Sequence, residues 1–305
     1  MIIARQEDVT TAVLEAFAKT PDPRLREILM ALVRHLHGFA REVKLTEREF
    51  QEAVNYVVQI GKHTSDSHNE GVLMAGSLGL SALVCLLNNG NAGQTETDAN
   101  MLGPFWRDDA PAMPNGASIV RSPTPGPAMF VDAVVKDRAG QPVAGAKVDI
   151  WQSSPEGLYE NQDPTQAEMN LRGVFTTDEE GRFSFRSVKP AGYPIPIDGP
   201  VGDMLRAQGR HNFRPAHLHV MVNKPGLKTL ISQVYVNDDP RLDTDVQFGV
   251  TRHLIGNYVR HAAGEPAPAP DVTGEWYSLT HEFVMEPGEM RMPRPPIRSK
   301  ALAAE

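Results

Sequence analysis

Apolar positions in the first hundred residues recur at helical spacing. Between residues 23 and 43 they fall three or four positions apart, which predicts a helix with one buried face: Leu25, Ile28, Leu29, Leu32, Val33 and Leu36. Thr46 followed by Glu49 is a capping-box signature. It predicts the start of a second helix, which would end near Gly61.

A third predicted helix, Glu70–Asn88, contains a long apolar stretch. Its Gly71, Ala75 and Gly79 lie four positions apart and form a smooth stripe against which another helix could pack closely. The stretch is interrupted by serines and glycines, and it is shorter than the roughly 20 residues that span a bilayer. We therefore expect a buried helix and no membrane segment.

After about Gly103 the pattern changes to short strands separated by proline and glycine. Seven strands are predicted, at residues 129–136, 146–151, 173–177, 182–188, 217–222, 229–236 and 278–285. Strands at this spacing, with no helices between them, favour an antiparallel β-sandwich. The sequence thus predicts an α+β chain, with an all-helical domain at 1–103 and a sandwich domain at 104–305.

Charge and cysteine content exclude several classes of protein. The net charge is −8 and no block of Lys or Arg occurs, which argues against a nucleic-acid partner. The single Cys85 rules out an intrachain disulfide and is interpreted as a small core residue. The N-terminal residues lack the apolar core of a signal peptide, so a cytoplasmic location is expected.

Four residues of the strand-rich part are candidates for metal chemistry. His217 and His219 lie two apart on a predicted strand, so both imidazoles face one side and could bind one metal ion. The same spacing also occurs in polar surface pairs and in core pairs. No zinc motif or acidic cluster accompanies them. Tyr159 and Tyr193 lie in segments rich in glycine and proline, where a tyrosine commonly covers the core.

Four longer motifs contain these residues in a fixed order: DIWQSSPEGLY, NLRGVFTTDEEGRFSFRSVKPAGYPIP, GRHNFRPAHLH and QVYV. With their spacing, the stretch from about Gly103 to Val250 resembles the intradiol ring-cleavage dioxygenases. The resemblance implies that residues 104–305 form the catalytic domain and that the preceding helices mediate dimerisation. The expected partners are a small aromatic diol and O₂, and the protein would be a homodimer, with a lipid between the N-terminal helices in several relatives.

The resemblance also implies one Fe(III) ion per chain, held by Tyr159, Tyr193, His217 and His219. Tyr159 and His217 would be equatorial ligands, and the other two would be axial. Phenolate is a hard anionic donor that suits a trivalent cation, whereas ferrous oxygenases tend to use two His and a carboxylate. When the diol binds, Tyr193 would leave the metal and accept a proton.

Two further residues match catalytic positions of the family. Arg214 would stabilise the charge that develops on the ring before O₂ attacks, the alternative being a solvated surface arginine. Gln233 would help to orient a ligand or the cyclic anhydride that precedes the product. His211 lies in the same motif but matches no ligand, so a structural role is expected.

Residues 193–202, 102–105 and 238–250 are similar to the hydroxyquinol-cleaving branch of the family. That branch converts 1,2,4-trihydroxybenzene to 3-hydroxy-cis,cis-muconate, the enol form of maleylacetate. Catechol, a substituted or chlorinated catechol, or a chlorinated hydroxyquinol is the alternative substrate. The implied substrate contacts are Leu73, Gly76, Leu102, Gly103, Phe105, Ile195, Pro196 and Arg214.

Gly76 departs from the pattern of that branch, which often places an acidic residue there. The sequence therefore predicts less polar contact and more room at this wall of the pocket. From other classes, a non-enzymatic β-sandwich binding module would also have short strands and exposed aromatics, and a zinc hydrolase could use His217 and His219. Neither accounts for two Tyr and two His in this order.

Overall fold

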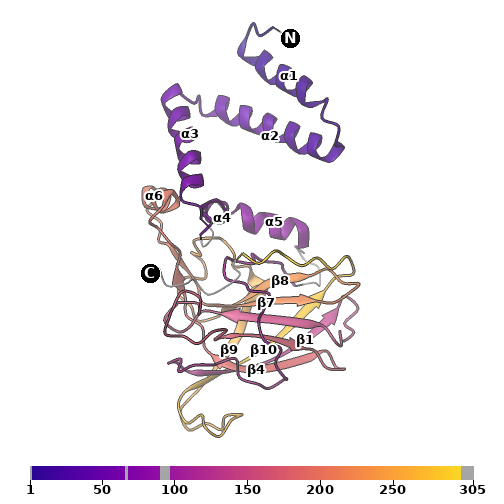
Figure 1. The fold of residues 1–305 in the computed structure, drawn as a ribbon, viewed down its shortest axis with the longest axis vertical. Coiled ribbons are helices and arrows are strands. Elements are labelled where there is room, and N and C mark those ends of the chain that lie inside the picture. The colour runs from indigo at the N-terminus through magenta and orange to yellow at the C-terminus, as the bar shows by residue number, and fades with distance from the viewer. Residues whose placement is uncertain (1, 66–67, 90–96, 297–305) are drawn as a thin grey trace. The chain divides into compact units, whose positions relative to one another are not determined.

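The computed structural model describes residues 2–65, 68–89 and 97–296. The chain forms two compact units, residues 1–59 and residues 60–305 (Figure 1). Among the described residues, the smaller unit is built from helices, and the larger unit contains further helices and the strands.

The smaller unit consists of α1 (Gln6–Phe17), α2 (Pro23–Glu42) and most of α3 (Glu47–Lys62). The predicted capping box before α3 is confirmed. The Thr46 backbone N–H donates to Glu49 Oε2 at 2.9 Å, and the Glu49 N–H donates to Thr46 Oγ1 at 3.3 Å. These bonds satisfy N–H groups that the first turn of a helix leaves without partners.

The prediction that one apolar face of α2 is buried is wrong for the single chain. Helix α1 packs against α2, but Leu25, Ile28, Leu32 and Leu36 stay 47–57% exposed, and Val33 is the buried residue of the helix. One short neighbouring helix covers only part of a 20-residue helix. An apolar stripe along α2 is therefore open to solvent.

The larger unit begins with two short helices where one was predicted. Helix α4 (Glu70–Ser77) ends before Gly79, which has φ +73°, and α5 (Leu80–Asn89) follows at an angle of 78°. A positive φ is not helical and favours glycine, so the stripe predicted through Gly79 does not continue along one helix. Among the described residues no single helix is long and apolar enough to cross a bilayer, and α4 and α5 pass that test only as a bent pair.

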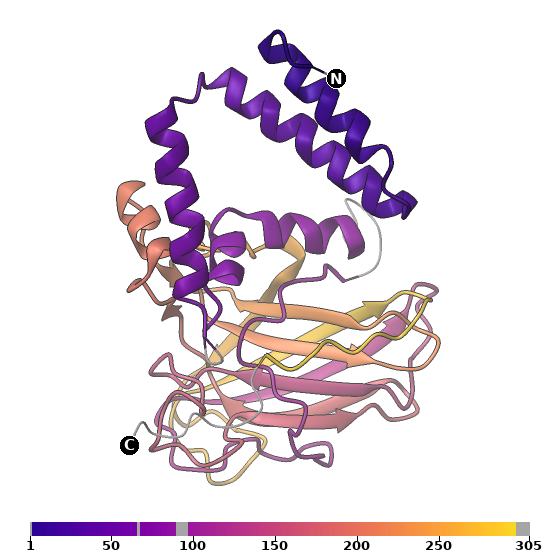
Figure 2. The same ribbon diagram turned by 45° about the horizontal axis from the view of Figure 1, so that its top comes forward.

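All seven predicted strands are present: β1 (Ala128–Asp137), β2 (Lys147–Gln152), β3 (Arg172–Thr176), β4 (Arg182–Val188), β7 (His217–Asn223), β8 (Leu230–Val236) and β10 (Trp276–Met285). The sequence reading missed β9 (Ile255–His261), the short pair β5 (Tyr193–Pro194) and β6 (Phe213–Arg214), helix α6 (Pro200–Ala207) and the 3-10 helix η1 (Arg252–Leu254). Helix α4 packs against α6. In the turned view of Figure 2, the strands of the larger unit lie together on one side of α4 and α5.

The main sheet has the order β3-β2-β7-β8-β9-β10-β1-β4. The predicted fully antiparallel arrangement is wrong, because β1 pairs with β10 in parallel over ten residues and β8 pairs with β9 in parallel. The spacing of strands along the chain predicts antiparallel pairing only for neighbours joined by short turns. Strands β1 and β10 are distant in the chain, so spacing does not predict their relative direction. The two ends of the sheet bury one shared core, which includes Val131, Ile150, Phe175, Val220 and Phe283.

Asp149 and Trp151 lie on the face of β2 opposite this core. Asp149 is buried and accepts a hydrogen bond from Trp106 Nε1 at 2.8 Å. Its burial raises the pKa of the carboxyl group to about 7, although the Trp106 bond and the charge of Arg172 act in the opposite direction. The folded protein thus favours the neutral acid, so the free energy of unfolding falls as the pH rises from about 4 towards 7.

Replacing Asp149 with Asn should remove this dependence on pH. We expect Asp149→Asn to unfold at a higher temperature than the parent at pH 8, with a smaller difference at pH 5. The upper bound of the gain is about 4 kcal/mol, from roughly three units of pKa shift. Asp132→Asn, at a 65% exposed side chain on β1, is the control. A difference in Tm for Asp149→Asn that is the same at both pH values would contradict this account.

Candidate metal centre

Four aromatic rings from three segments meet in the larger unit. Tyr159 follows β2, Tyr193 lies in β5, and His217 and His219 lie on β7. The ring centroids are 5.5 Å apart for Tyr159–Tyr193 and Tyr193–His217, 4.7 Å for His217–His219 and 6.2 Å for Tyr159–His219. All four side chains are buried. Both imidazoles face one side of the sheet, as the spacing predicts.

The donor atoms of these rings suit a metal ion. His217 Nδ1 lies 2.7 Å from Pro215 O, an arrangement in which Nδ1–H donates and Nε2 keeps its lone pair. The two Nε2 atoms are 3.1 Å apart. Metal–nitrogen bonds of about 2.1 Å at right angles would place two ligand atoms roughly 3 Å apart. Tyr159 Oη is buried and has no hydrogen-bond partner among the described residues, so a bound cation would supply the partner that it lacks.

Burial controls the protonation of these groups. It lowers the pKa of His217 to about 3, with the charge of Arg214 acting in the same direction, and it holds the pKa of His219 well below its usual value. Both imidazoles are therefore neutral and available as ligands. Burial and the neighbouring Tyr193 raise the pKa of Tyr159 well above its usual value. Among the described residues, no three or more His, Cys, Asp or Glu side chains are placed so that they could hold a metal ion, so a metal ion here would need the tyrosines.

Neighbouring residues fix the orientation of the rings. Phe105 stacks on Tyr159 with centroids 4.3 Å apart, and Trp151 stacks on His219 at 4.7 Å. Gly103 has φ +74°, and a Cβ atom there would lie 3.1 Å from His219 Cε1. Glycine at this position therefore lets the backbone pass close to the imidazole.

Arg214 is buried beside the rings, so the alternative of a solvated surface arginine is wrong. It pairs with Tyr193 across β5 and β6. Its guanidinium bonds Asp245 through Nε at 3.2 Å and Nη2 at 3.1 Å. Nη2 also donates to Gln233 Oε1 at 2.9 Å and Tyr235 Oη at 2.7 Å. A buried positive charge is thus held in one orientation next to Tyr193.

Comparison with known proteins identifies the family. Residues 101–287 match the family model described as Dioxygenase, and residues 22–96 match the one described as Catechol dioxygenase N terminus. A hydroxyquinol 1,2-dioxygenase of Rhizobium sp. (strain MTP-10005) is 39% identical over 92% of this chain and 95% of its own length. A 6-chlorohydroxyquinol 1,2-dioxygenase of Cupriavidus pinatubonensis is 40% identical over 92% and 98%.

Among solved structures, the hydroxyquinol 1,2-dioxygenase from Pseudomonas putida DLL-E4 superposes with a TM-score of 0.85 at 37% identity, covering 93% of this chain and 99% of that chain. The chain belongs to the intradiol ring-cleavage dioxygenases. The family predicted from the sequence motifs is therefore confirmed. The match to the Dioxygenase model includes all four ring residues and Arg214.

In this intradiol dioxygenase, the sequence reading missed the partners of Arg214. Tyr235 and Asp245 bond its guanidinium, and Asn100 Nδ2 lies 3.3 Å from Tyr235 Oη. Alternation along β8 could have indicated Tyr235, because Gln233 and Tyr235 share a face and pair with His219 and His217. Asp245 lies in a loop, where spacing gives no such signal.

A buried ion cluster next to Tyr159 was also missed. Glu160 Oε1 accepts hydrogen bonds from Arg107 Nη1 at 3.2 Å and Arg172 Nε at 2.8 Å. Arg172 Nη1 donates to the backbone oxygen of Phe105 at 2.6 Å. The cluster thereby ties the segment of Tyr159 to that of Phe105, whose ring stacks on it.

The predicted substrate contacts occupy different places in this dioxygenase. Leu102 and Phe105 pack against the ring cluster, and Gly103 lies against His219. Leu73 and Gly76 are buried in α4, and Ile195 is buried whereas Pro196 is exposed. The extra room expected beside Gly76 is filled by the side chain of Gln247.

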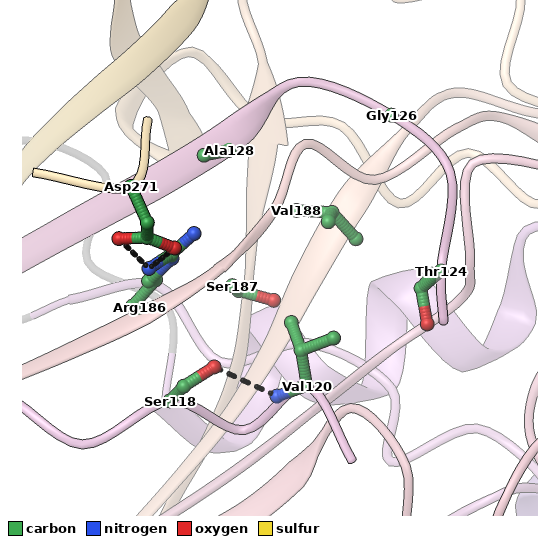
Figure 3. A pocket seen from close by; sticks show the side chains of 9 residues that line it. All are labelled: Ser118, Val120, Thr124, Gly126, Ala128, Arg186, Ser187, Val188 and Asp271. Atoms are coloured by element: carbon green, nitrogen blue, oxygen red, sulfur yellow. Dashed lines mark hydrogen bonds and ion pairs between the residues drawn. The ribbon is translucent and has the colours of Figure 1, made fainter. Parts of the chain in front are cut away.

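His211 does not join the rings of the metal centre. It is exposed at the edge of its motif and bonds Thr244 at 3.0 Å. Figure 3 shows a surface hollow beside β1 and β4. An ion pair between Arg186 and Asp271, 2.8 Å long, lies in this hollow. The lining of this hollow contains none of the four ring residues, so the hollow is distinct from the metal centre.

Asp245 should be needed for stability, because without it Arg214 is a buried charge with no counter-charge. We expect Asp245→Asn to lower the free energy of unfolding by about 3 kcal/mol, the lower end of the cost of breaking a buried pair. Asp203→Asn, in the exposed pair with Arg206 on α6, should cause little change. Urea unfolding of both variants measures the difference, and equal effects would contradict this role.

Proposed function

We propose that this intradiol dioxygenase cleaves hydroxyquinol with O₂ between its two adjacent hydroxyl-bearing carbons, giving 3-hydroxy-cis,cis-muconate, the enol form of maleylacetate. The observation that carries the proposal is the convergence of two buried tyrosines and two buried histidines beside buried Arg214. Relatives named for hydroxyquinol and 6-chlorohydroxyquinol support the choice of diol. Catechol or a chlorinated catechol is the alternative substrate.

Tyr159, Tyr193, His217 and His219 would hold one ferric ion per chain. Bound there, the ion would withdraw electron density from the chelated diol and so favour attack of O₂ on the ring. Two phenolates would offset two of its three charges, which favours the ferric state. The unpartnered Oη of buried Tyr159 and the 3.1 Å separation of the histidine nitrogens support this ligand set.

The residues of the chain contribute proton transfer, charge and shielding. Tyr193 Oη would accept a proton from a diol hydroxyl group. Arg214, its cross-strand partner, supplies a fixed positive charge for the ring as negative charge develops on it. Gln233, bonded to Arg214 and to the backbone oxygen of Met101 at 2.8 Å, would orient a ligand or the product. Phe105 and Trp151 keep water away from two of the ligand rings.

The helical part of the chain would mediate dimerisation. The exposed apolar stripe of α2, which contains Leu32 and Leu36, supports a homodimer formed through the N-terminal helices. Such a stripe would also accommodate a lipid chain. In this proposal residues 1–103 serve assembly, and residues 104–305 contain the iron site.

Oxygen uptake by the purified protein tests the function. We expect about one iron per chain by elemental analysis, a visible tyrosinate-to-iron band that shifts when a diol is added, and a higher kcat/KM for hydroxyquinol than for catechol or 4-chlorocatechol. Zinc in place of iron, or iron without a visible band, would contradict the metal assignment. A binding module would consume no oxygen, and faster cleavage of catechol would favour the alternative substrate.

The two tyrosines should differ when each is replaced. Tyr159→Phe should lose much of the visible band and bind iron poorly. Tyr193→Phe should keep iron but lose turnover, because the group that accepts the proton is absent. Tyr277→Phe, a buried tyrosine of the core, is the control and should match the parent. Metal content, the visible spectrum and kcat measure the outcome, and full turnover by Tyr193→Phe would refute its role.

A further inference from the structure

The closest neighbour of Gly76 outside its own helix is the amide of Gln247. A Cβ atom added at Gly76 would lie 3.0 Å from both Cδ and Nε2 of Gln247 and 3.3 Å from its Oε1. These distances are at or below the limit of ordinary carbon contacts, so the amide lies directly against the glycine. Any side chain at position 76 would force Gln247 to move. Gly76 and the Gln247 amide therefore pack directly against each other.

The backbone of Gln247 is held by the segment that orients Arg214. Asp245 Oδ1 accepts the Gln247 N–H at 3.2 Å, and Asp245 Oδ2 accepts the Gly249 N–H at 2.9 Å. The same carboxylate bonds Arg214. Because one buried side chain holds both, the position of Gln247 is linked to that of the guanidinium beside Tyr193.

Helix α4, which contains Gly76, is linked to the segment that follows Tyr193. Glu70, in the first turn of α4, is buried, and its Oε1 accepts the N–H of Val201 at 2.8 Å. Val201 lies in the first turn of α6, a few residues after Tyr193 and Ile195. Helix α4 is thus fixed to the chain that carries one of the rings. Gln247 lies between α4 and the Arg214 segment, and both of these are linked to Tyr193.

The amide of Gln247 is polar and half-buried. It offers two N–H donors and an acceptor oxygen. None of these makes a hydrogen bond to a described residue, although the backbone N–H does. Gln233, in contrast, uses both ends of its amide, on Arg214 and on Met101. Gln247 is therefore the amide near Arg214 with hydrogen-bonding capacity left for a ligand.

We propose that Gln247 determines the specificity of this enzyme: its amide, which fills the space beside Gly76, hydrogen-bonds a ring hydroxyl other than the two of the diol. The inference rests on the proposed cleavage of aromatic diols. The substrate class is a diol with a further hydrogen-bonding group on the ring. Because the amide carries no charge, an apolar ring substituent beside it should weaken substrate binding less than it would beside a carboxylate.

Replacement of Gln247 by Met tests this, because Met is similar in length and makes no comparable hydrogen bond. We expect the ratio of kcat/KM for hydroxyquinol to that for catechol to fall about 3- to 10-fold, the size of one neutral hydrogen bond. The dissociation constant of hydroxyquinol, measured by calorimetry without oxygen, should rise by a similar factor, and that of catechol should not. Gln141→Met, at an exposed turn, is the matched control.

Gly76→Ala gives a second, independent measurement. Its methyl group should displace the amide and lower the same ratio in the parent enzyme. In the Gln247→Ala background the methyl group has nothing to displace, so Gly76→Ala should add no further change. A purely structural effect of the methyl group would appear in both backgrounds.

The outcomes separate this inference from the proposed function. If the parent enzyme cleaves both diols and Gln247→Met leaves the ratio and both dissociation constants unchanged, the role of Gln247 is wrong and the function stands. If the parent consumes oxygen with no diol, the proposed function itself fails. If Gln247→Met does not fold, the Gly76→Ala measurements decide, and an unchanged ratio there overturns the inference.

Discussion

The pairing of β7 with β8 controls the polar face on which the site is built. His217 lies opposite Tyr235 and His219 lies opposite Gln233, so all four point to the same side of the sheet. On the other side, Leu218, Val220 and Val234 belong to the core. A shift of pairing by one residue would turn the histidines into the core and the aliphatic residues into the site. The hydrophobic core thereby fixes the register that brings the imidazoles together.

Burial of charge sets a second constraint around that face. Arg214 and Asp245 are both about 2% exposed, and Glu160 lies buried between Arg107 and Arg172. Removing an ion from water costs several kcal/mol, which only close opposite charges and well-placed hydrogen bonds offset. Such groups have few alternative arrangements of similar energy. The fixed positions of Tyr159 and Tyr193 follow from this, because each is adjacent to one of these charge clusters in the chain or across a strand pair.

Local signals in the sequence predicted many of the helices and strands. Features that join distant parts of the chain were not predicted. Turn residues and strand composition gave seven strands, and the Thr46–Glu49 box gave the start of α3. The break between α4 and α5 was missed because periodicity does not reveal a positive φ at Gly79. Strand direction, the ion pair of Arg214 with Asp245, and the packing of Gln247 against Gly76 all join distant parts of the chain. They depend on the tertiary fold, which a single sequence read by local pattern does not contain. The same limit explains why the space beside Gly76 was misjudged.

The parallel pairing of β1 with β10 has a consequence for how this chain acquires its structure. The two strands meet over ten residue pairs, from Ala128 with Trp276 to Asp137 with Met285. Proteins dominated by such long-range contacts have high contact order and fold slowly, because a long loop must close before the contacts form. During synthesis β1 can pair with β4 early, but its other edge stays open until residues 276–285 have left the ribosome. Until then that edge is a template for pairing with other chains, and aggregation of nascent protein competes with closure of the sheet.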